Sequence, residues 1–338
     1  MALRTSNPRL LLLLLLVTAV RATVPFPVNA QAAAATATTT AAASRSAPKA
    51  PKQSVSTTTT PTHSPTTRSP TGSPSVRTSL APTSSNNNGI LYGGGAVFTS
   101  PTVYVIWYGD WATPESQVTV AATELFLRSL SNTTYYAILG TYYQTTSTRD
   151  YVSSTLVFGG STTDRYSQGA SLTEGSIHAA ISDAVTTHKL PYNNEGIYVL
   201  VSSGHVTEGS LCHGACGWHS SPTIGNLGRA ASVFVGLAAQ CATGCAPPRF
   251  FANSTHGQLA DGLINVLSHE LAESITDPFG DAWNSRELGD KCVWHMGAIL
   301  TDPSNNKTYN IILSGGNQFT VQQLWVNADG GYCALGYP

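Results

Sequence analysis

The distribution of apolar residues beyond residue 89 predicts short strands separated by amphipathic helices. Apolar runs of strand type occur at 103–107, 151–158, 197–201 and 233–235. One helix is predicted to start at Thr113-Pro114-Glu115, with threonine as cap and proline at the first position, and another at the capping box 171–174. Because strands and helices alternate, we predict a layered α/β sheet.

The inward faces of these two helices follow from helical spacing. For the first helix we expect Val118, Ala121, Ala122, Leu125 and Ser129 to face the core, and for the second Ile177, Ile181, Ala184 and Val185.

The segment 261–278 reads as one longer amphipathic helix, with Asp261 as its cap and Pro278 as its stop. Its apolar stripe consists of Leu263, Ile264, Leu267, Leu271 and Ile275. His269 and Glu273, four residues apart, fall together on the side opposite that stripe, and Glu270 lies toward one edge of it.

These three side chains form an H-E-x-x-E motif, which is the H-E-x-x-H motif of zinc hydrolases with glutamate in place of the second histidine. His269 and Glu273 are predicted to hold one divalent metal, and Glu270 is predicted to act as a general base toward a water molecule. The five letters alone favour a solvated helix face, because charged residues on the wet side of any helix produce them. A metal site on this helix therefore needs further ligands from other segments.

Acidic residues follow the helix within a segment rich in turn formers. Glu287 and Asp290 are the candidates for a third ligand, as in zinc hydrolases that complete their site with a loop carboxylate. Asp277 is a further candidate, with an Asx-turn before Pro278 as the alternative. His219, in the segment CGWHSS, is either a rigidly held ligand or a histidine bonded to a local carbonyl group. His205, His213, His256 and His295 have less to recommend them.

The first residues have the features of a secretory signal peptide: Arg4 and Arg9, seven leucines at 10–16, and small-residue cleavage sites. We predict a signal peptide at 1–22, with cleavage as late as residue 30. The apolar run is shorter than the roughly 20 residues of a spanning helix. No later segment is long and apolar enough, so we expect no membrane span in the mature chain.

Residues 23–88 are rich in alanine, threonine, serine and proline, and predict a disordered stalk ahead of a domain at 89–338. Charge supports this boundary. All 18 acidic residues lie at Asp110 or beyond, whereas eight of the 17 lysines and arginines precede Asp110. The chain from Asp110 onward therefore carries a net charge of −9. A domain this acidic argues against nucleic acid as its partner.

Six cysteines and three N-glycosylation sequons fit an exported chain. An even cysteine number in an oxidising compartment favours three disulfides, with Cys292–Cys333 expected as one of them. A four-thiolate zinc site built from the two C-x3-C pairs, Cys212/Cys216 and Cys241/Cys245, is the alternative. The sequons begin at Asn132, Asn253 and Asn306.

Six motifs follow one another in an order typical of one known family: ILYGGGAVFTSPTVYVIWYGDW, IYVLVSSGHVTEG, CHGACGWHSS, CATGCA, DGLINVLSHELAESITDPFGDAW and QQLWVNADGGYC. Together they resemble the EXORDIUM or phosphate-induced protein family over nearly all of 89–338. That resemblance implies a secreted, extracellular or cell-wall protein linked to growth, with no settled biochemical activity.

Within that resemblance, land-plant members lack His and Glu at the positions matching His269, Glu270 and Glu273. This chain has SHELAESITDPFG and RELGDKC, similar to microbial relatives, and so carries the form suited to metal. His219 matches the histidine of the family's C-G-x-H segment, which is present even where the His-Glu pair is absent.

Two hypotheses follow. In the first, a zincin-like layered sheet with helices and a loop-rich, disulfide-bonded C-terminal part carries a zinc site, and Glu270 serves a peptidase-like hydrolase. In the second, the domain is a non-enzymatic apoplastic protein with a structural or vestigial site for zinc or calcium. Its partners would be an extracellular protein, a peptide or a cell-wall component.

Overall fold

The computed structural model describes residues 88–237 and 241–338. The predicted signal peptide and all of the predicted stalk except Asn88 lie outside the described residues. The domain boundary at residue 89 therefore stays a prediction.

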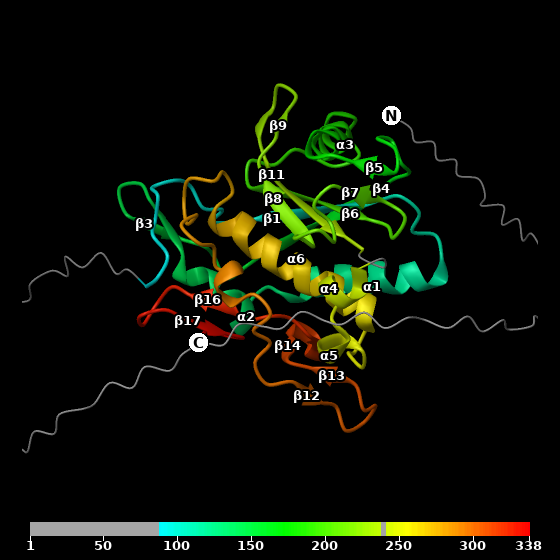
Figure 1. The fold of residues 1–338 in the computed structure, drawn as a ribbon. Helices are drawn as coiled ribbons and strands as arrows, with labels where there is room; N and C mark the ends of the chain where they lie inside the picture. The colour runs from blue at the N-terminus through cyan, green and yellow to red at the C-terminus, as the bar shows by residue number, and fades with distance from the viewer. Residues whose placement is uncertain (1–87, 238–240) are drawn as a thin grey trace, which may run out of the picture. The chain divides into compact units, whose positions relative to one another are not determined.

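A five-stranded sheet forms the centre of the described chain, in the order β4–β1–β6–β11–β8 (Figure 1). The first four strands are parallel, and the edge strand β8 is antiparallel to β11. Their bounds are β1 Thr102–Tyr108, β4 Val157–Asp164, β6 Gly196–Ser202, β8 Gly217–Ser220 and β11 Ala231–Gly236. This sheet confirms the predicted α/β class.

Helices cover both faces of the sheet (Figure 1). α3 (Glu174–Thr186) lies on one face, where it packs in one apolar cluster with Ile106 and Phe234. α1 (Pro114–Ser129) and α6 (Gln258–Thr276) lie on the other face, in a cluster with Val105 and Val233. Alternate residues of each central strand face opposite layers, which is why β1, β6 and β11 are buried throughout and mostly apolar.

The predicted inward face of α3 is confirmed, since Ile177, Ile181, Ala184 and Val185 are all buried. That of α1 is wrong in large part. Val118 and Leu125 are exposed, and α1 buries Thr119, Ala122, Thr123, Phe126, Leu127 and Ser129. The helix is turned so that its larger side chains, Phe126 and Leu127, reach the core.

The predicted strand at 151–158 is also wrong, because the structure divides this segment. Its start belongs to β3 (Arg149–Tyr151), which forms a hairpin with β2 (Tyr143–Thr145), and its end belongs to β4. β4 continues through the polar sequence GGSTTD at the sheet edge, where apolar periodicity is weak. A Cβ at Gly159 would lie 2.2 Å from the Tyr104 ring, so glycine is required there.

Short elements make up the remainder, and the C-terminal part is rich in loops as predicted. The short helices are α2 (Thr134–Ala137), α4 (Ala242–Cys245), α5 (Pro248–Phe251) and the 3-10 turns η1 (Leu139–Thr141), η3 (Asp290–Cys292) and η4 (Ser314–Gly316). The short strands are β5 (Ser171–Leu172), β7 (Thr207–Glu208), β9 (Thr223–Ile224), β10 (Gly228–Arg229), β12 (Leu300–Thr301), β13 (Thr308–Tyr309), β14 (Ile311–Leu313), β15 (Asn317–Phe319), β16 (Leu324–Val326) and β17 (Tyr332–Ala334).

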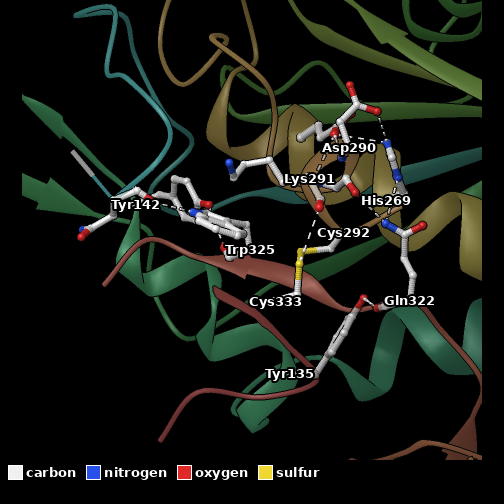
Figure 2. Close-up of a disulfide and its surroundings, with 12 residues drawn as sticks. Tyr135, Tyr142, His269, Asp290, Lys291, Cys292, Gln322, Trp325 and Cys333 are labelled. Atoms are coloured by element: carbon white, nitrogen blue, oxygen red, sulfur yellow. Dashed lines mark hydrogen bonds and ion pairs between the residues drawn. A yellow bond between two sulfur atoms is a disulfide. The ribbon is translucent and has the colours of Figure 1, made fainter. Parts of the chain in front are cut away.

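All six cysteines form disulfides, which confirms the three predicted bridges and excludes the four-thiolate zinc site in this oxidised state. The pairs are Cys212–Cys241, Cys216–Cys245 and Cys292–Cys333. The first two join the residues around β8 to α4, which directly precedes the α5–α6 region. The third fastens η3 to β17 and so holds the loop that follows α6 (Figure 2).

The three sequon asparagines, Asn132, Asn253 and Asn306, are exposed, and their glycosylation stays a prediction. Within the described ranges, none of the helices has both the length and the apolar character that a membrane crossing requires.

Candidate metal centre

α6 holds His269, Glu270 and Glu273 between β8 and the loop that follows the helix. The helix is longer at its start than predicted: Gly257 is its N-cap, and the Asp261 carboxylate instead accepts a hydrogen bond from the backbone N–H of His256. Glu270 is only 7% exposed and Glu273 only 3%. The alternative of a solvated helix face is therefore wrong, because the loop covers Glu273 and β8 packs against Glu270.

The loop grips Glu273 through its backbone. Oε1 of Glu273 accepts hydrogen bonds from the N–H groups of Gly289 and Asp290, both at 3.1 Å. A Cβ at Gly289 would lie 2.8 Å from Glu273 Oε1 and 2.8 Å from the His269 ring. Only glycine leaves room for the carboxylate and the imidazole to meet there.

Two imidazoles flank Glu273, one on each carboxylate oxygen. His269 Nε2 lies 3.1 Å from Oε1, and His219 Nε2 lies 3.6 Å from Oε2. The loop supplies one acid on each side: Glu287 is 3.1 Å from His219 Nε2, and Asp290 is 3.6 Å from His269 Nε2. Figure 2 shows His269 with Asp290 beside it.

The structure thus brings the predicted site residues His269, Glu270, Glu273, Glu287 and Asp290 together with the candidate His219. Two groups of three each place one ligand atom per residue within 4.8 Å of one another: His219, Glu270 and Glu273, and His269, Glu273 and Asp290. His219 lies on β8, next to the disulfide-bonded Cys216. Side chains alternate between the two faces of a strand, so Gly217 and His219 share one face of β8, and that face is turned toward α6. A strand predicted directly after Cys216 would therefore have placed His219 beside the helix.

Asp277 stands outside both groups, and its carboxylate is bound by the chain that follows α6. Its Oδ1 accepts a hydrogen bond from the N–H of Ala282 at 2.7 Å, directly after the end of α6. Burial raises the pKa of its carboxyl group.

The cluster carries more negative than positive charge. Its four carboxylates belong to Glu270, Glu273, Glu287 and Asp290, and its positive charge is limited to two imidazoles. Among the described residues, no lysine or arginine forms an ion pair with any of these acids. Imidazole nitrogens with carboxylate oxygens are a donor set that suits zinc better than calcium, which takes oxygen ligands.

The pKa values reflect this surplus. Burial alone would lower the pKa of His269, but Glu273, Glu270 and Asp290 raise it to about 10. Burial likewise opposes a charge on His219, whose pKa is raised by Glu287, Glu273 and Glu270 to about 9. Burial raises the pKa of Glu270 to about 7, against the opposing effect of His269.

One contact opposes a second proton on His269. The side-chain Nε2 of Gln322 donates to Gly289 O at 2.9 Å and lies 3.1 Å from His269 Nδ1 (Figure 2). The same amide therefore directs an N–H at Nδ1, which must accept it. This contact favours a single ring proton, on Nε2 and directed at Glu273, whereas the acidic neighbours favour the doubly protonated ring.

The position of this proton bears on metal binding. A metal on Nε2 needs the proton on Nδ1, so the Gln322 amide would have to turn to offer its oxygen. The donor atoms and the negative charge of the cluster therefore fit a metal ion. The hydrogen bonds of His269 to Gln322 and Glu273 would have to rearrange before Nε2 could bind one.

A cavity of about 230 Å³ lies beside these side chains. His269, Glu270 and Asp290 line it together with the apolar Val266, Val293 and Trp294. A small part of a substrate would fit here next to the carboxylate of Glu270.

Comparison with known proteins gives the family. The model of the phosphate-induced protein 1 conserved region matches residues 90–335. The chain belongs to this family. Its predicted family resemblance is thereby confirmed.

Relatives of the phosphate-induced protein family cover most of the chain. Protein EXORDIUM-like 5 of Arabidopsis thaliana is 28% identical over 72% of this chain and 76% of its own length. Protein EXORDIUM-like 3 of the same plant is 30% identical over 72% of this chain and 82% of its own length. Protein PHOSPHATE-INDUCED 1 of Nicotiana tabacum is 24% identical over 69% and 83%. No solved structure matches the chain, so a zincin-like arrangement stays a prediction.

Proposed function

We propose that this EXORDIUM-like protein is a secreted, extracellular hydrolase whose cluster around Glu273 binds a divalent cation, zinc by its donor set. The observation that carries the proposal is the convergence on one buried carboxylate of side chains from three segments: β8, α6 and the loop at 287–290. Buried acids in such surplus are retained where they pair or coordinate a metal.

The residues have distinct roles in this proposal. His269, Glu273 and Asp290, one of the two groups of three, would supply the ligands and leave a position open, while His219 and Glu287 pair beside them. A cation bound there supplies Lewis acidity toward a peptide or related carbonyl group. Glu270, which lines the cavity, accepts the proton of the attacking water and passes it to the leaving amine.

The cavity beside Glu270 would hold the part of the substrate next to the reacting carbonyl group. Val266 and Trp294 offer apolar walls for a substrate side chain beside Glu270. Exclusion of water by these walls strengthens every charge interaction at the reacting group.

A second function is favoured by the contact between Gln322 and His269. In this alternative the His269 proton is donated to Glu273, and the cluster is a hydrogen-bonded fastening of loop 287–292 onto α6. The protein would then act as a non-enzymatic apoplastic growth or signalling protein that binds a cell-wall component or a receptor, with a structural or vestigial cation site.

Metal removal separates the two functions. The purified secreted chain should cleave members of a peptide library, lose this activity with a chelator, and regain it with zinc but not with magnesium. The reason is that magnesium prefers octahedral oxygen ligands and suits imidazole poorly. Cleavage that survives complete metal removal, or no cleavage under any of these conditions, would contradict the hydrolase function. Retained fold without cleavage supports the alternative.

A further inference from the structure

The edge strand β8 leaves one side of its backbone without a partner. It is the last strand of the central sheet (Figure 1), and among the described residues no strand or isolated bridge pairs with its outer edge. Proteins usually blunt such an edge with charged side chains, proline or a covering segment. The sequence of β8 is Gly-Trp-His-Ser, which contains neither proline nor an acidic residue, lysine or arginine.

The pairing of β8 with β11 shows which of its backbone groups are free. The N–H of Gly236 donates to Cys216 O at 3.3 Å. Bonded and unbonded pairs alternate along an antiparallel ladder, so the next bonded residue of β8 is Trp218. Gly217 and His219 hold the unbonded positions, and their N–H and C=O groups therefore point away from β11. Outside this ladder, no described residue forms a backbone hydrogen bond with them.

The free edge is accessible and borders the metal centre. Gly217 is partly exposed, and because glycine has no side chain, the exposed surface belongs to its backbone. Gly217 also lines the cavity of about 230 Å³ together with Glu270. A Cβ at Gly217 would lie 2.8 Å from Val266 Cγ1 and 3.2 Å from Glu270 Cγ, so β8 lies directly against this part of α6. A chain paired with β8 would run past the cavity.

The groups beside this edge select their occupant. Outward N–H and C=O groups on alternate residues match the backbone of an extended peptide. Val266, Val293 and Trp294 line the cavity and would enclose one apolar side chain. The carboxylates of the cluster outnumber its imidazoles, and the Asp290 side chain is 60% exposed at the cavity, which favours lysine or arginine in the peptide. A dimer through the four residues of β8 would leave the cavity unfilled.

We propose that the free edge of β8 binds an extended, basic peptide segment of another protein as an added strand, with one apolar side chain in the cavity beside Glu270. The inference goes beyond the proposed function and does not rest on it, because main-chain pairing requires neither a bound cation nor cleavage.

The test uses the full-length chain after metal removal, so that binding is measured without hydrolysis. The probe is the capped heptapeptide Thr-Lys-Thr-Leu-Thr-Lys-Thr, whose leucine and lysines share one face of a strand. Saturating probe should slow amide hydrogen exchange at Gly217 and His219 about tenfold or more, as followed by NMR. Trp218 is the internal control, because its N–H is already bonded to β11 and should not change.

Altered probes separate main-chain pairing from other contacts. N-methylation of the leucine, or of the threonine that follows it, removes one N–H, and only one of these two groups can point toward β8. One methylated probe should therefore bind about tenfold or more weakly than the other in calorimetry. Glutamate in place of both lysines should also weaken binding.

Three results would overturn the proposal: unchanged exchange at Gly217 and His219, equal binding of the two methylated probes, and tighter binding of the glutamate probe. Slow exchange of these amides that depends on protein concentration without any probe would assign the edge to a second copy instead. Protection by the probe in a chain that cleaves nothing would refute the hydrolase and keep this docking site. Cleavage by the zinc-loaded chain without protection at β8 would do the reverse.

Discussion

Replacing Glu273 with alanine should abolish cation binding and lower the free energy of unfolding by about 3 to 5 kcal/mol. Glu273 is the shared member of both ligand groups, so its removal leaves neither group complete. It also accepts hydrogen bonds from the N–H groups of Gly289 and Asp290 and contacts both imidazoles. In Glu273→Ala these buried donors lose their partner, and the loop loses its attachment to α6.

Glu174→Ala is the matched control, because Glu174 is a helical glutamate whose side chain is 64% exposed. We expect it to change stability by no more than about 1 kcal/mol. Chemical denaturation and bound-metal analysis on the same preparations measure both effects. A Glu273→Ala variant as stable as Glu174→Ala, with its cation retained, would refute the central role of Glu273.

Glu270→Gln should reduce peptide hydrolysis by a hundredfold or more while the fold and the bound cation are kept. Glutamine preserves the size and hydrogen bonding of Glu270 in the cavity but cannot accept the proton of water. The measurement is kcat/KM on the best peptide of a library, with metal content determined in parallel.

The parallel determination matters because Glu270 also belongs to the group with His219 and Glu273. Loss of the cation in Glu270→Gln would make Glu270 a ligand and not the base. Unchanged hydrolysis in a variant that keeps its cation would remove Glu270 from the chemistry altogether.

The central strands were predictable from the sequence because their apolar residues form clear runs. The runs at 103–107 and 197–201 became central strands because both faces of those strands are buried, which leaves an unbroken apolar run in the sequence. β4 was not predictable in the same way. It is an edge strand whose residues 159–164 are polar or glycine, and only its packing against Tyr104 explains Gly159.

The helical half of the site followed from spacing, since His269, Glu270 and Glu273 are fixed relative to one another by α6. His219 could be ranked ahead of the other histidines by its place near Cys216, but it could not be assigned to the site from the sequence. It comes from β8, 50 residues before His269, and only strand pairing with β11 brings it to Glu273. Gln322 was missed entirely. It lies in an irregular segment before β16, and no motif marks an amide that will orient an imidazole.

Metal analysis of the wild-type chain shows directly whether the cluster around Glu273 binds zinc. The purified chain is saturated with zinc, passed through metal-free gel filtration, and measured by elemental mass spectrometry together with Glu273→Ala. We expect about one zinc per wild-type chain and none in Glu273→Ala. Wild-type protein that retains no zinc, or a variant that retains as much as wild type, would contradict zinc binding by this cluster.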